Sequence, residues 1–197
     1  MRKEIKIDFW NEIILEPIED DRISKTYGED ENVYFGKSSN NFGECIFFVM
    51  NNSLIGISFY EPHSPHALDD FMRRRIPKAK FIHDASAVLS YSRWLNSPES
   101  WEQSESPRIQ FVGTYFQKQV WKELLRIKMG ELSTYSRIAS AIAKPSSYRA
   151  VANAIGNNPI ALIVPCHRVI SKSGAISGYR WGTKRKQQII DWEKSFI

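Results

Sequence analysis

The segment 157–169 constrains this 197-residue chain most, because it is an apolar run that ends in a cysteine with polar neighbours. Five apolar side chains follow one another over 160–164. The run is too short for a helix, so it predicts a buried strand that carries Cys166 at its C-terminal end. Pro165 has no N–H group to donate, which predicts that strand pairing stops there.

Cys166 is followed directly by His167 and Arg168. A thiol is nucleophilic as the thiolate, and a neighbouring cation or imidazole is the kind of group that lowers a cysteine pKa. A free cysteine is often a small buried hydrophobe, but that role gives no use to two polar neighbours. The sequence therefore predicts a reactive cysteine. Adjacent residues of a strand point to opposite faces, so His167 reaches the sulfur only if the chain turns or a water bridges them.

The charge of the chain is divided unevenly between its two parts. Residues 1–112 hold 13 Lys or Arg against 18 Asp or Glu, a net −5, whereas residues 113–197 hold 14 against 4, a net +10. A basic patch on a small domain is typical of a nucleic-acid binder, because neutralising phosphates supplies most of the non-specific affinity. A merely solvated basic face does not explain why acids are so scarce there.

The pattern of residues 1–112 predicts an α+β unit between two less regular stretches. Residues 1–31 read as an acidic N-terminal extension with one apolar patch at 13–15, either partly ordered or a mobile tail. An N-terminal α/β domain over 32–96 is expected to combine an antiparallel meander with two helices and a short strand. The meander strands lie near 33–35, 43–50 and 54–60, the first helix at 66–76, the short strand at 81–82 and the second helix at 88–95. Residues 97–112, rich in Ser, Glu and Pro over 97–107, are expected to form a linker.

Residues 113–197 are expected to form a mostly helical domain. An apolar face follows Thr114, a candidate N-cap, and Gly130 is expected to end that first helix. Two short helices follow, over 135–143 and 148–155, capped by 133–134 and Ser147 and joined by a turn that contains proline. This arrangement predicts a helix-turn-helix.

The second of these helices has a surface that suits a narrow groove. It offers one long cation, Arg149, among methyl-sized side chains, whereas major-groove readout calls for several amide and guanidinium groups. The pattern predicts sequence-independent binding to double-stranded DNA from the minor-groove side, with Arg149 entering the base stack. The residues expected to contact DNA are Ser147, Tyr148, Arg149, Ala150, Ala152 and Arg168.

The remaining composition limits the class of protein. No apolar run is long enough to span a bilayer, and the first six residues are not followed by a signal core. We expect an intracellular monomer without cofactor, metal or membrane contact, in the cytoplasm or, in a eukaryote, the nucleus. Cys45 and Cys166, which could in principle pair, are then both expected to stay reduced.

The motif Pro-Cys-His-Arg-Val at 165–169 has a Gly-Asn-Asn-Pro motif before it at 156–159 and Gly-Tyr-Arg-Trp-Gly after it at 178–182. In this order and spacing the motifs resemble the O6-alkylguanine-DNA alkyltransferases, also called methylated-DNA-protein-cysteine methyltransferases. The resemblance is good from about Gly113 onward and weaker back to about Asn32. It implies an RNase H-like N-terminal domain, a winged-helix-like C-terminal domain, and direct, irreversible transfer of an alkyl group from O6-alkylguanine, and from O4-alkylthymine, to Cys166.

The same resemblance implies the roles of the site residues. Tyr135 would offer its phenol to the flipped guanine, Asn158 would hold the active-site turn, and His167 would connect Cys166, through a water, to Glu193 on a last helix over 187–193. The loop 171–182 would wall the base pocket, whose members are Val169, Tyr179, Arg180, Trp181 and Lys186. Arg149 would fill the space that the flipped nucleotide leaves. The stable thioether product implies one turnover per molecule.

Two other classes of function remain open at this point. A thiol hydrolase would use Cys166, His167 and Glu193 as a triad, but would leave the basic part and the helix-turn-helix unused. A non-catalytic sensor of alkylated DNA with the same fold would explain the charge but not the cysteine. The reactivity of Cys166 toward an alkylated base separates these classes.

Overall fold

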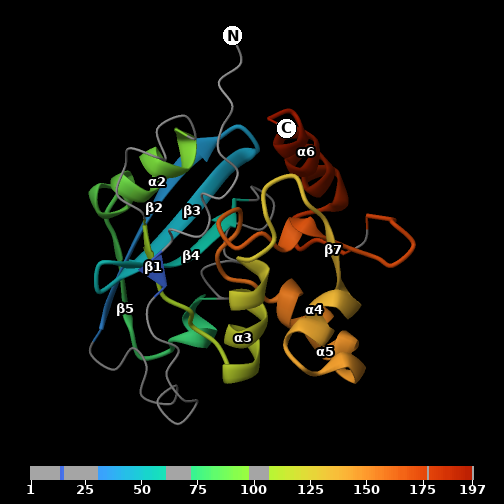
Figure 1. Cartoon of the computed structure of the whole chain (residues 1–197). Helices are drawn as coiled ribbons and strands as arrows, with labels where there is room; N and C mark the ends of the chain where they lie inside the picture. The colour runs from blue at the N-terminus through green and yellow to red at the C-terminus, as the bar shows by residue number, and fades with distance from the viewer. Residues whose placement is uncertain (1–13, 16–30, 61–71, 98–106, 177, 197) are drawn as a thin grey trace. The chain divides into compact units, whose positions relative to one another are not determined.

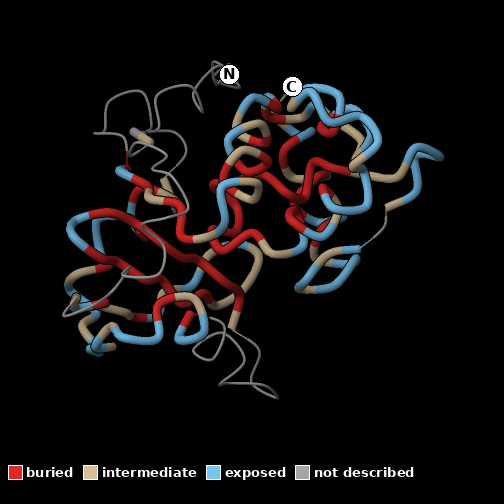
Figure 2. Tube along the Cα trace, turned by 90° about the horizontal axis from the view of Figure 1, so that it is seen from below, coloured by how far each residue is buried: buried red, intermediate tan, exposed pale blue. Residues whose placement is uncertain are grey.

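The computed structural model describes residues 14–15, 31–60, 72–97, 107–176 and 178–196, shown as a cartoon in Figure 1. These residues fall into two compact units. The described part of unit 1 lies in Phe116–Asn158 and Leu162–Ile197, and that of unit 2 lies in Glu12–Tyr115 and Pro159–Ala161. Figure 2 shows a buried interior in each unit.

Unit 2 is built on an antiparallel meander, as predicted. Strand β2 (Asn32–Asn40) pairs with β3 (Gly43–Met50), and β3 pairs with β4 (Ser53–Phe59). Asn51 and Asn52 connect β3 to β4 with positive φ angles of 50° and 60°. Two successive left-handed residues give the turn that best matches the twist of a hairpin, and asparagine tolerates this conformation.

The sheet extends beyond the meander through parallel pairs, which the sequence did not predict. Its order is β1-β6-β4-β3-β2-β5. Strand β5 (Lys80–His83) lies parallel to β2, and β6 (Arg108–Ile109) lies parallel to β4 and β1 (Ile14–Leu15). The short 3-10 helix η3 (Ser86–Val88) leads into α2 (Leu89–Asn96), close to the predicted second helix.

The sheet therefore corrects the predicted linker and part of the predicted extension. Residues 107–112 are not linker, because β6 pairs within the sheet and Ile109, Phe111 and Val112 are buried. The apolar patch near the N-terminus supplies strand β1. Most of the predicted extension, most of the predicted helix 66–76 and residues 98–106 of the predicted linker lie outside the described residues, and 72–75 are helical.

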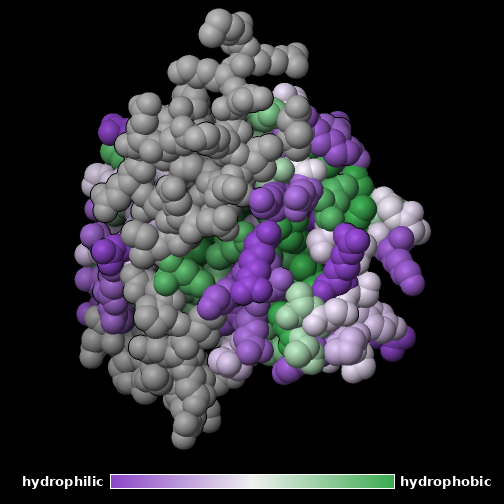
Figure 3. All heavy atoms as spheres, in the orientation of Figure 1, coloured by the Kyte–Doolittle hydropathy of each residue, from purple (hydrophilic) through white to green (hydrophobic). Residues whose placement is uncertain are grey.

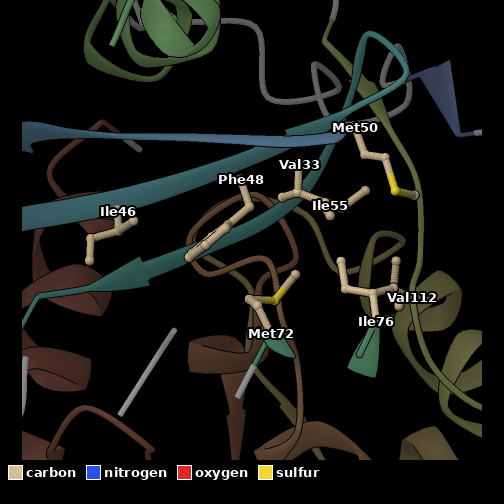
Figure 4. Close-up of a cluster of buried hydrophobic side chains, with 8 residues drawn as sticks. All are labelled: Val33, Ile46, Phe48, Met50, Ile55, Met72, Ile76 and Val112. Atoms are coloured by element: carbon tan, nitrogen blue, oxygen red, sulfur yellow. The ribbon is translucent and has the colours of Figure 1, made fainter. Parts of the chain in front are cut away.

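One face of the sheet carries the core of unit 2. In Figure 4, side chains from β2, β3 and β4 point toward Met72, Ile76 and Val112, which come from outside the sheet. The cluster consists of Val33, Ile46, Phe48, Met50, Ile55, Met72, Ile76 and Val112. Burying side chains of this size stabilises the unit by about 1.5–3 kcal/mol each.

Unit 1 begins with helix α3 (Tyr115–Leu124), whose Val120, Trp121 and Leu124 are buried. The prediction that Gly130 ends this helix is wrong, because the helix stops at Leu124 and hydrogen-bonded turns follow. Gly130 instead takes a φ of 77° within the loop to the next helix, a conformation that favours glycine. The indole Nε1 of Trp121 donates to the carbonyl oxygen of Ala154 over 2.8 Å, which holds α3 against a later helix.

Two short helices joined by a turn follow, as predicted. Helix α4 (Tyr135–Ala141) has Thr134 as N-cap, whose Oγ1 accepts from the Arg137 N–H over 3.3 Å. The 3-10 helix η5 (Pro145–Ser147) leads into α5 (Tyr148–Gly156). The predicted capping role of Ser147 is wrong in one respect, since its side chain makes no capping hydrogen bond. Strand β7 (Ser133–Thr134), directly before α4, pairs with the later strand β8 (Val169–Ile170), and helix α6 (Thr183–Lys194) follows β8.

The architecture is a mixed α+β fold, as predicted. Among the described residues, no helix combines the length and the apolar character needed to cross a membrane. In the same ranges, no group of three or more His, Cys, Asp or Glu side chains could hold a metal ion. Cys45 and Cys166 are both buried, and no disulfide joins them.

Candidate active site

The segment 160–164 does not form the predicted strand. Ile160 makes a single bridge to Ile57, and the chain then turns through Leu162, whose φ is 66°. This left-handed conformation costs a non-glycine residue about 1–2 kcal/mol. The apolar side chains are nevertheless all buried, so burial without alternation misled the prediction. Cys166 consequently lies at the start of a 3-10 helix, η6 (Cys166–Arg168), rather than at the end of a strand.

The Cys166 thiol is 4% exposed and is contacted by the side chain of Asn158. The Asn158 Nδ2 donates to the Cys166 Sγ over 3.2 Å and to the carbonyl oxygen of Val164 over 2.9 Å. Burial raises the pKa of the Cys166 thiol, while the Asn158 hydrogen bond, the charge of Lys186 and nearby backbone N–H groups oppose that rise. The groups that favour the thiolate are therefore Asn158 and Lys186, not the Arg168 expected from the sequence.

Lys186, on α6, is fully buried and its Nζ donates to the carbonyl oxygen of Val169. Burial lowers the pKa of Lys186 to about 8, against the attraction of the Cys166 thiolate, which raises it. A lysine with this pKa is still mostly charged at neutral pH and places a cation beside the sulfur. The role predicted for Lys186 was to line the base pocket, and its position adds an electrostatic role.

His167 and Glu193 form the buried pair that the resemblance implies. The His167 Nε2 lies 2.8 Å from the Glu193 Oε1. Burial lowers the pKa of His167, against the charge and hydrogen bond of Glu193, so the imidazole is neutral at neutral pH. Burial alone would raise the pKa of Glu193, but His167 and Arg168 outweigh it and lower that pKa to about 2. Because the ionised carboxylate can only accept, Nε2 is the protonated nitrogen.

The prediction that Arg168 contacts DNA is wrong. Its side chain is fully buried, and its Nε and Nη2 donate to the Glu193 carboxylate over 2.7–3.1 Å. Its Nη1 donates to the carbonyl oxygen of Ile127. A guanidinium enclosed in this way cannot reach a phosphate, and removing either partner of such a buried pair would leave an uncompensated charge.

Tyr135 stands at the first position of α4, directly after the strand pair that joins β7 to β8. This pairing connects the start of α4 to the chain that leaves η6, with Ser133 opposite Val169. A Cβ atom placed on Gly178 would lie 3.8 Å from the Tyr135 Oη, so the phenol lies beside the loop 171–182. The structure thus brings Tyr135 to the loop that the resemblance assigns to the base pocket.

The loop 171–182 presents two aromatic side chains and a cation. The rings of Tyr179 and Trp181 meet edge to face with centroids 5.1 Å apart, and the Arg180 guanidinium lies 5.9 Å from the Trp181 ring. Arg180 is exposed, and the two aromatic residues are half-buried. Val169 is fully buried, so its side chain belongs to the interior of unit 1.

Helix α5 exposes the residues expected to face DNA. Tyr148 is 46% exposed and carries the Arg149 guanidinium 5.6 Å from its ring centroid. Arg149 and Ala150 are exposed, and Ala152 and Ser147 are half-buried. Val151 and Ala154 are buried and pack the other side of the helix. Where Figure 1 labels α4 and α5, the surface in Figure 3 is mostly pale, the shade of residues of intermediate hydropathy.

Two members of the Glu193 network could not be found from the sequence. They are backbone groups, the carbonyl oxygen of Ile127 and the N–H of Gly130, which donates to the Glu193 Oε2 over 3.4 Å. Every residue has such groups, so no side-chain pattern marks them. The sequence signal is the glycine at 130, because glycine readily takes the positive φ that the structure shows there.

The chain resembles known proteins over the regions that carry this site. The profile of the DNA-binding domain of 6-O-methylguanine DNA methyltransferases matches residues 115–195. The inducible methylated-DNA-protein-cysteine methyltransferase of Bacillus subtilis is 35% identical over 150 residues, which cover 75% of this chain and 84% of that protein. The Salmonella typhimurium regulatory protein ada is 51% identical over 81 residues, covering 41% of this chain and 23% of that protein.

A solved structure agrees with these matches. Mycobacterium tuberculosis OGT in complex with DNA superposes with a TM-score of 0.67 and 34% identity, covering 84% of this chain and 95% of that chain. The fold and site define a protein with a buried, hydrogen-bonded cysteine in the same unit as a two-helix motif exposed on one side. The chain belongs to the methylated-DNA-protein-cysteine methyltransferase family.

Proposed function

We propose that this protein repairs DNA by transferring the alkyl group of an O6-alkylguanine directly to Cys166. The observation that carries the proposal is the Asn158 hydrogen bond to the Cys166 sulfur, in a unit that also holds the His167–Glu193 pair and an exposed α5. A hydrogen bond to the sulfur favours the thiolate, the form that attacks an alkyl carbon. The family relationship supports the same reaction.

The reaction balances without a cofactor. The Cys166 thiol gives its proton to the Nδ1 of His167 through a bridging water, and the thiolate attacks the alkyl carbon. The S–C bond forms while the C–O6 bond breaks, and the bonding electron pair goes to the guanine. The base takes up one proton, aided by the Tyr135 phenol near its ring, and leaves as unmodified guanine. A thioether is stable to hydrolysis, so each molecule would react once.

The target base must leave the duplex before this step. An O6-alkyl group sits inside the stack, and extruding the nucleotide costs a few kcal/mol. The small side chains of α5, with Arg149 beside them, suit approach from the minor groove, where Arg149 would fill the space left behind. The Mycobacterium tuberculosis relative solved in complex with DNA supports DNA as the partner. Contacts to phosphates and groove shape would make binding largely independent of sequence.

The finer assignments follow the family resemblance. O4-alkylthymine presents the same leaving-group chemistry and would be a second substrate. Tyr179, Arg180 and Trp181 would form the wall of the base pocket, with Tyr179 against the base. We further propose an RNase H-like unit 2, a winged-helix-like unit 1, a monomer, and a site of action in the cytoplasm or, in a eukaryote, the nucleus.

Mass spectrometry of the intact protein and of its peptides tests the reaction. The wild-type chain is incubated with a duplex that carries one O6-methylguanine. We expect the peptide with Cys166 to gain one methylene, saturating at one per chain, and the peptide with Cys45 to stay unchanged. The variant Cys166→Ser should bind the duplex and gain nothing. Tight binding by wild type without a methylene would favour the damage sensor, and cleavage of an ester or amide probe at Cys166 would favour the hydrolase.

A further inference from the structure

The buried Arg168 side chain donates to a carboxylate and to a backbone oxygen of unit 1. Its Nε donates to both Glu193 oxygens, over 3.1 Å to Oε1 and 2.9 Å to Oε2, and its Nη2 donates to Oε1 over 2.7 Å. Its Nη1 donates to the Ile127 carbonyl oxygen. An arginine fork fixes a carboxylate in both position and plane, which a single point charge does not do. Arg168 therefore determines how the Glu193 carboxylate is turned.

The Glu193 oxygen that Arg168 contacts most closely also faces His167. Oε1 accepts from Nη2 of Arg168 and lies 2.8 Å from the His167 Nε2. A carboxylate offers no proton, so this contact requires the imidazole proton on Nε2 and leaves the lone pair on Nδ1. The Nδ1 is buried and has no hydrogen-bond partner among the described residues. The unprotonated Nδ1 is therefore the nitrogen that can accept the proton of Cys166.

We propose that Arg168 is a positioning residue that locks His167 in the Nε2–H tautomer by holding Glu193 ionised and oriented. The inference rests on the proposed alkyl transfer, in which Nδ1 receives the Cys166 proton. In that step the S–H bond breaks, an N–H bond forms at Nδ1, and the imidazolium is balanced by the Glu193 carboxylate. Without Arg168, the carboxylate could rotate away from Nε2, or take up a proton and donate to Nε2. In either case the imidazole proton could move to Nδ1, which could then no longer accept the Cys166 proton.

The charged groups around His167 act in opposite directions on its pKa. Glu193 on α6 favours the imidazolium, while Arg168 on η6 and Lys186 on α6 disfavour it, and burial lowers the pKa further. Replacing Arg168 removes a positive charge that disfavours the imidazolium of His167. The replacement is therefore not expected simply to make His167 a weaker base. The expected defect is in the position of the proton, which a pH profile alone would not identify.

The decisive measurement is the tautomer of His167, read from the ¹⁵N shifts of its ring nitrogens in the labelled full chain. Wild type and the control Arg126→Met, which removes an exposed arginine of the same unit, should show a protonated Nε2 and an unprotonated Nδ1. Arg168→Met should move part or all of the proton to Nδ1. An Arg168→Met spectrum identical to wild type would overturn the proposal.

Transfer and binding are then measured on the same variants. Single-turnover methyl transfer by Arg168→Met should be slower by about 10²-fold, the contribution of a general base. Its affinity for duplex DNA in a Cys166→Ser background should match that of the control. A loss of affinity with an unchanged tautomer would overturn the proposal in favour of a DNA contact. If wild type transfers no methyl group, the proposed function fails while the tautomer result still stands.

A second variant covers the case in which Arg168→Met does not fold. Arg168→Lys keeps the charge, but one ammonium group does not bind a carboxylate through two parallel hydrogen bonds as a guanidinium does. We expect this variant to fold, with a mixture of His167 tautomers and an intermediate rate of transfer. A folded Arg168→Lys protein with the wild-type tautomer and the wild-type rate would contradict the proposal.

Discussion

The side-chain amide of Asn158 donates from one nitrogen both to the Cys166 sulfur, over 3.2 Å, and to the Val164 carbonyl oxygen, over 2.9 Å. The two bonds bring the nucleophile and the turn that precedes it to the same donor. Hydrogen bonds to charged groups contribute about 1.5–3 kcal/mol. The Asn158 bond to the sulfur is therefore large enough to affect the reaction as well as the fold.

Asn158→Ala should slow methyl transfer by about tenfold to a hundredfold, because losing a bond to the thiolate raises the pKa of Cys166 further. Single-turnover rates at pH 7.5 measure the effect. Asn157→Ala is the matched control, since the Asn157 Nδ2 donates to the backbone and side-chain oxygens of Asn153, over 2.9 Å each. Equal rates in the two variants would contradict a role for Asn158 in activating the thiol.

Lys186→Met should lower the transfer rate most at and below neutral pH. Burial lowers the pKa of Lys186 to about 8, so below pH 8 the charged ammonium favours the thiolate, and above it that help disappears. The rates of wild type and Lys186→Met should therefore converge as pH rises through 8. Rate profiles from pH 6.5 to 9.5, with exposed Lys184→Met as control, test this. A gap that widens above pH 8 would rule the idea out.

The Glu193 carboxylate should make stability depend on pH in the acid range. Its pKa is lowered from 4.5 to about 2 in the fold, so it contributes stability that is fully present above 4.5 and lost as pH falls toward 2. The contribution is on the order of 3 kcal/mol. Urea unfolding of wild type and Glu193→Gln between pH 7 and pH 3 measures it. We expect the difference between the two proteins to shrink as pH falls.

Arg149→Ala should weaken repair in a duplex more than reaction with the free alkylated base. The exposed guanidinium can fill the space that the extruded nucleotide leaves in the base stack, and that space exists only in a duplex. Transfer rates on the duplex and on free O6-methylguanine are compared for the variant, with Arg126→Met as control. Equal losses on both substrates would count against a role in the base stack.

The sequence predicted the elements better than their connections. The meander, α4, α5 and the Thr134 cap follow from local patterns of apolar and capping residues, which the structure confirms. Strands β1 and β6 and their parallel pairing were missed, because two-residue strands leave almost no period to read. The strand predicted at 81–82 is present as β5, but its parallel pairing with β2 was not predicted. The strand predicted at 160–164 failed because continuous burial is shared by strands and buried turns.

In the candidate site, too, the residues could be predicted better than their contacts. Cys166, His167, Glu193 and Asn158 were expected together, and in unit 1 they form two hydrogen-bonded pairs, Asn158 with Cys166 and His167 with Glu193. Arg168 was assigned to the surface because arginine in a basic segment usually faces phosphate. It instead donates to a carboxylate 25 residues away and to a backbone oxygen 41 residues away, and neither spacing is visible in a local pattern.

The bridge between β4 and the segment Pro159–Ala161 has a consequence for how the chain acquires its site. The Ile57 N–H donates to the Pro159 oxygen and the Ala161 N–H donates to the Ile57 oxygen, each over 2.9 Å. These partners lie about 100 residues apart, and contacts across such separations form slowly because a long loop must close first. During synthesis, residues 159–161 emerge long after β4 and only shortly before Cys166. We therefore expect this bridge, and with it the turn that leads to Cys166, to form late in folding.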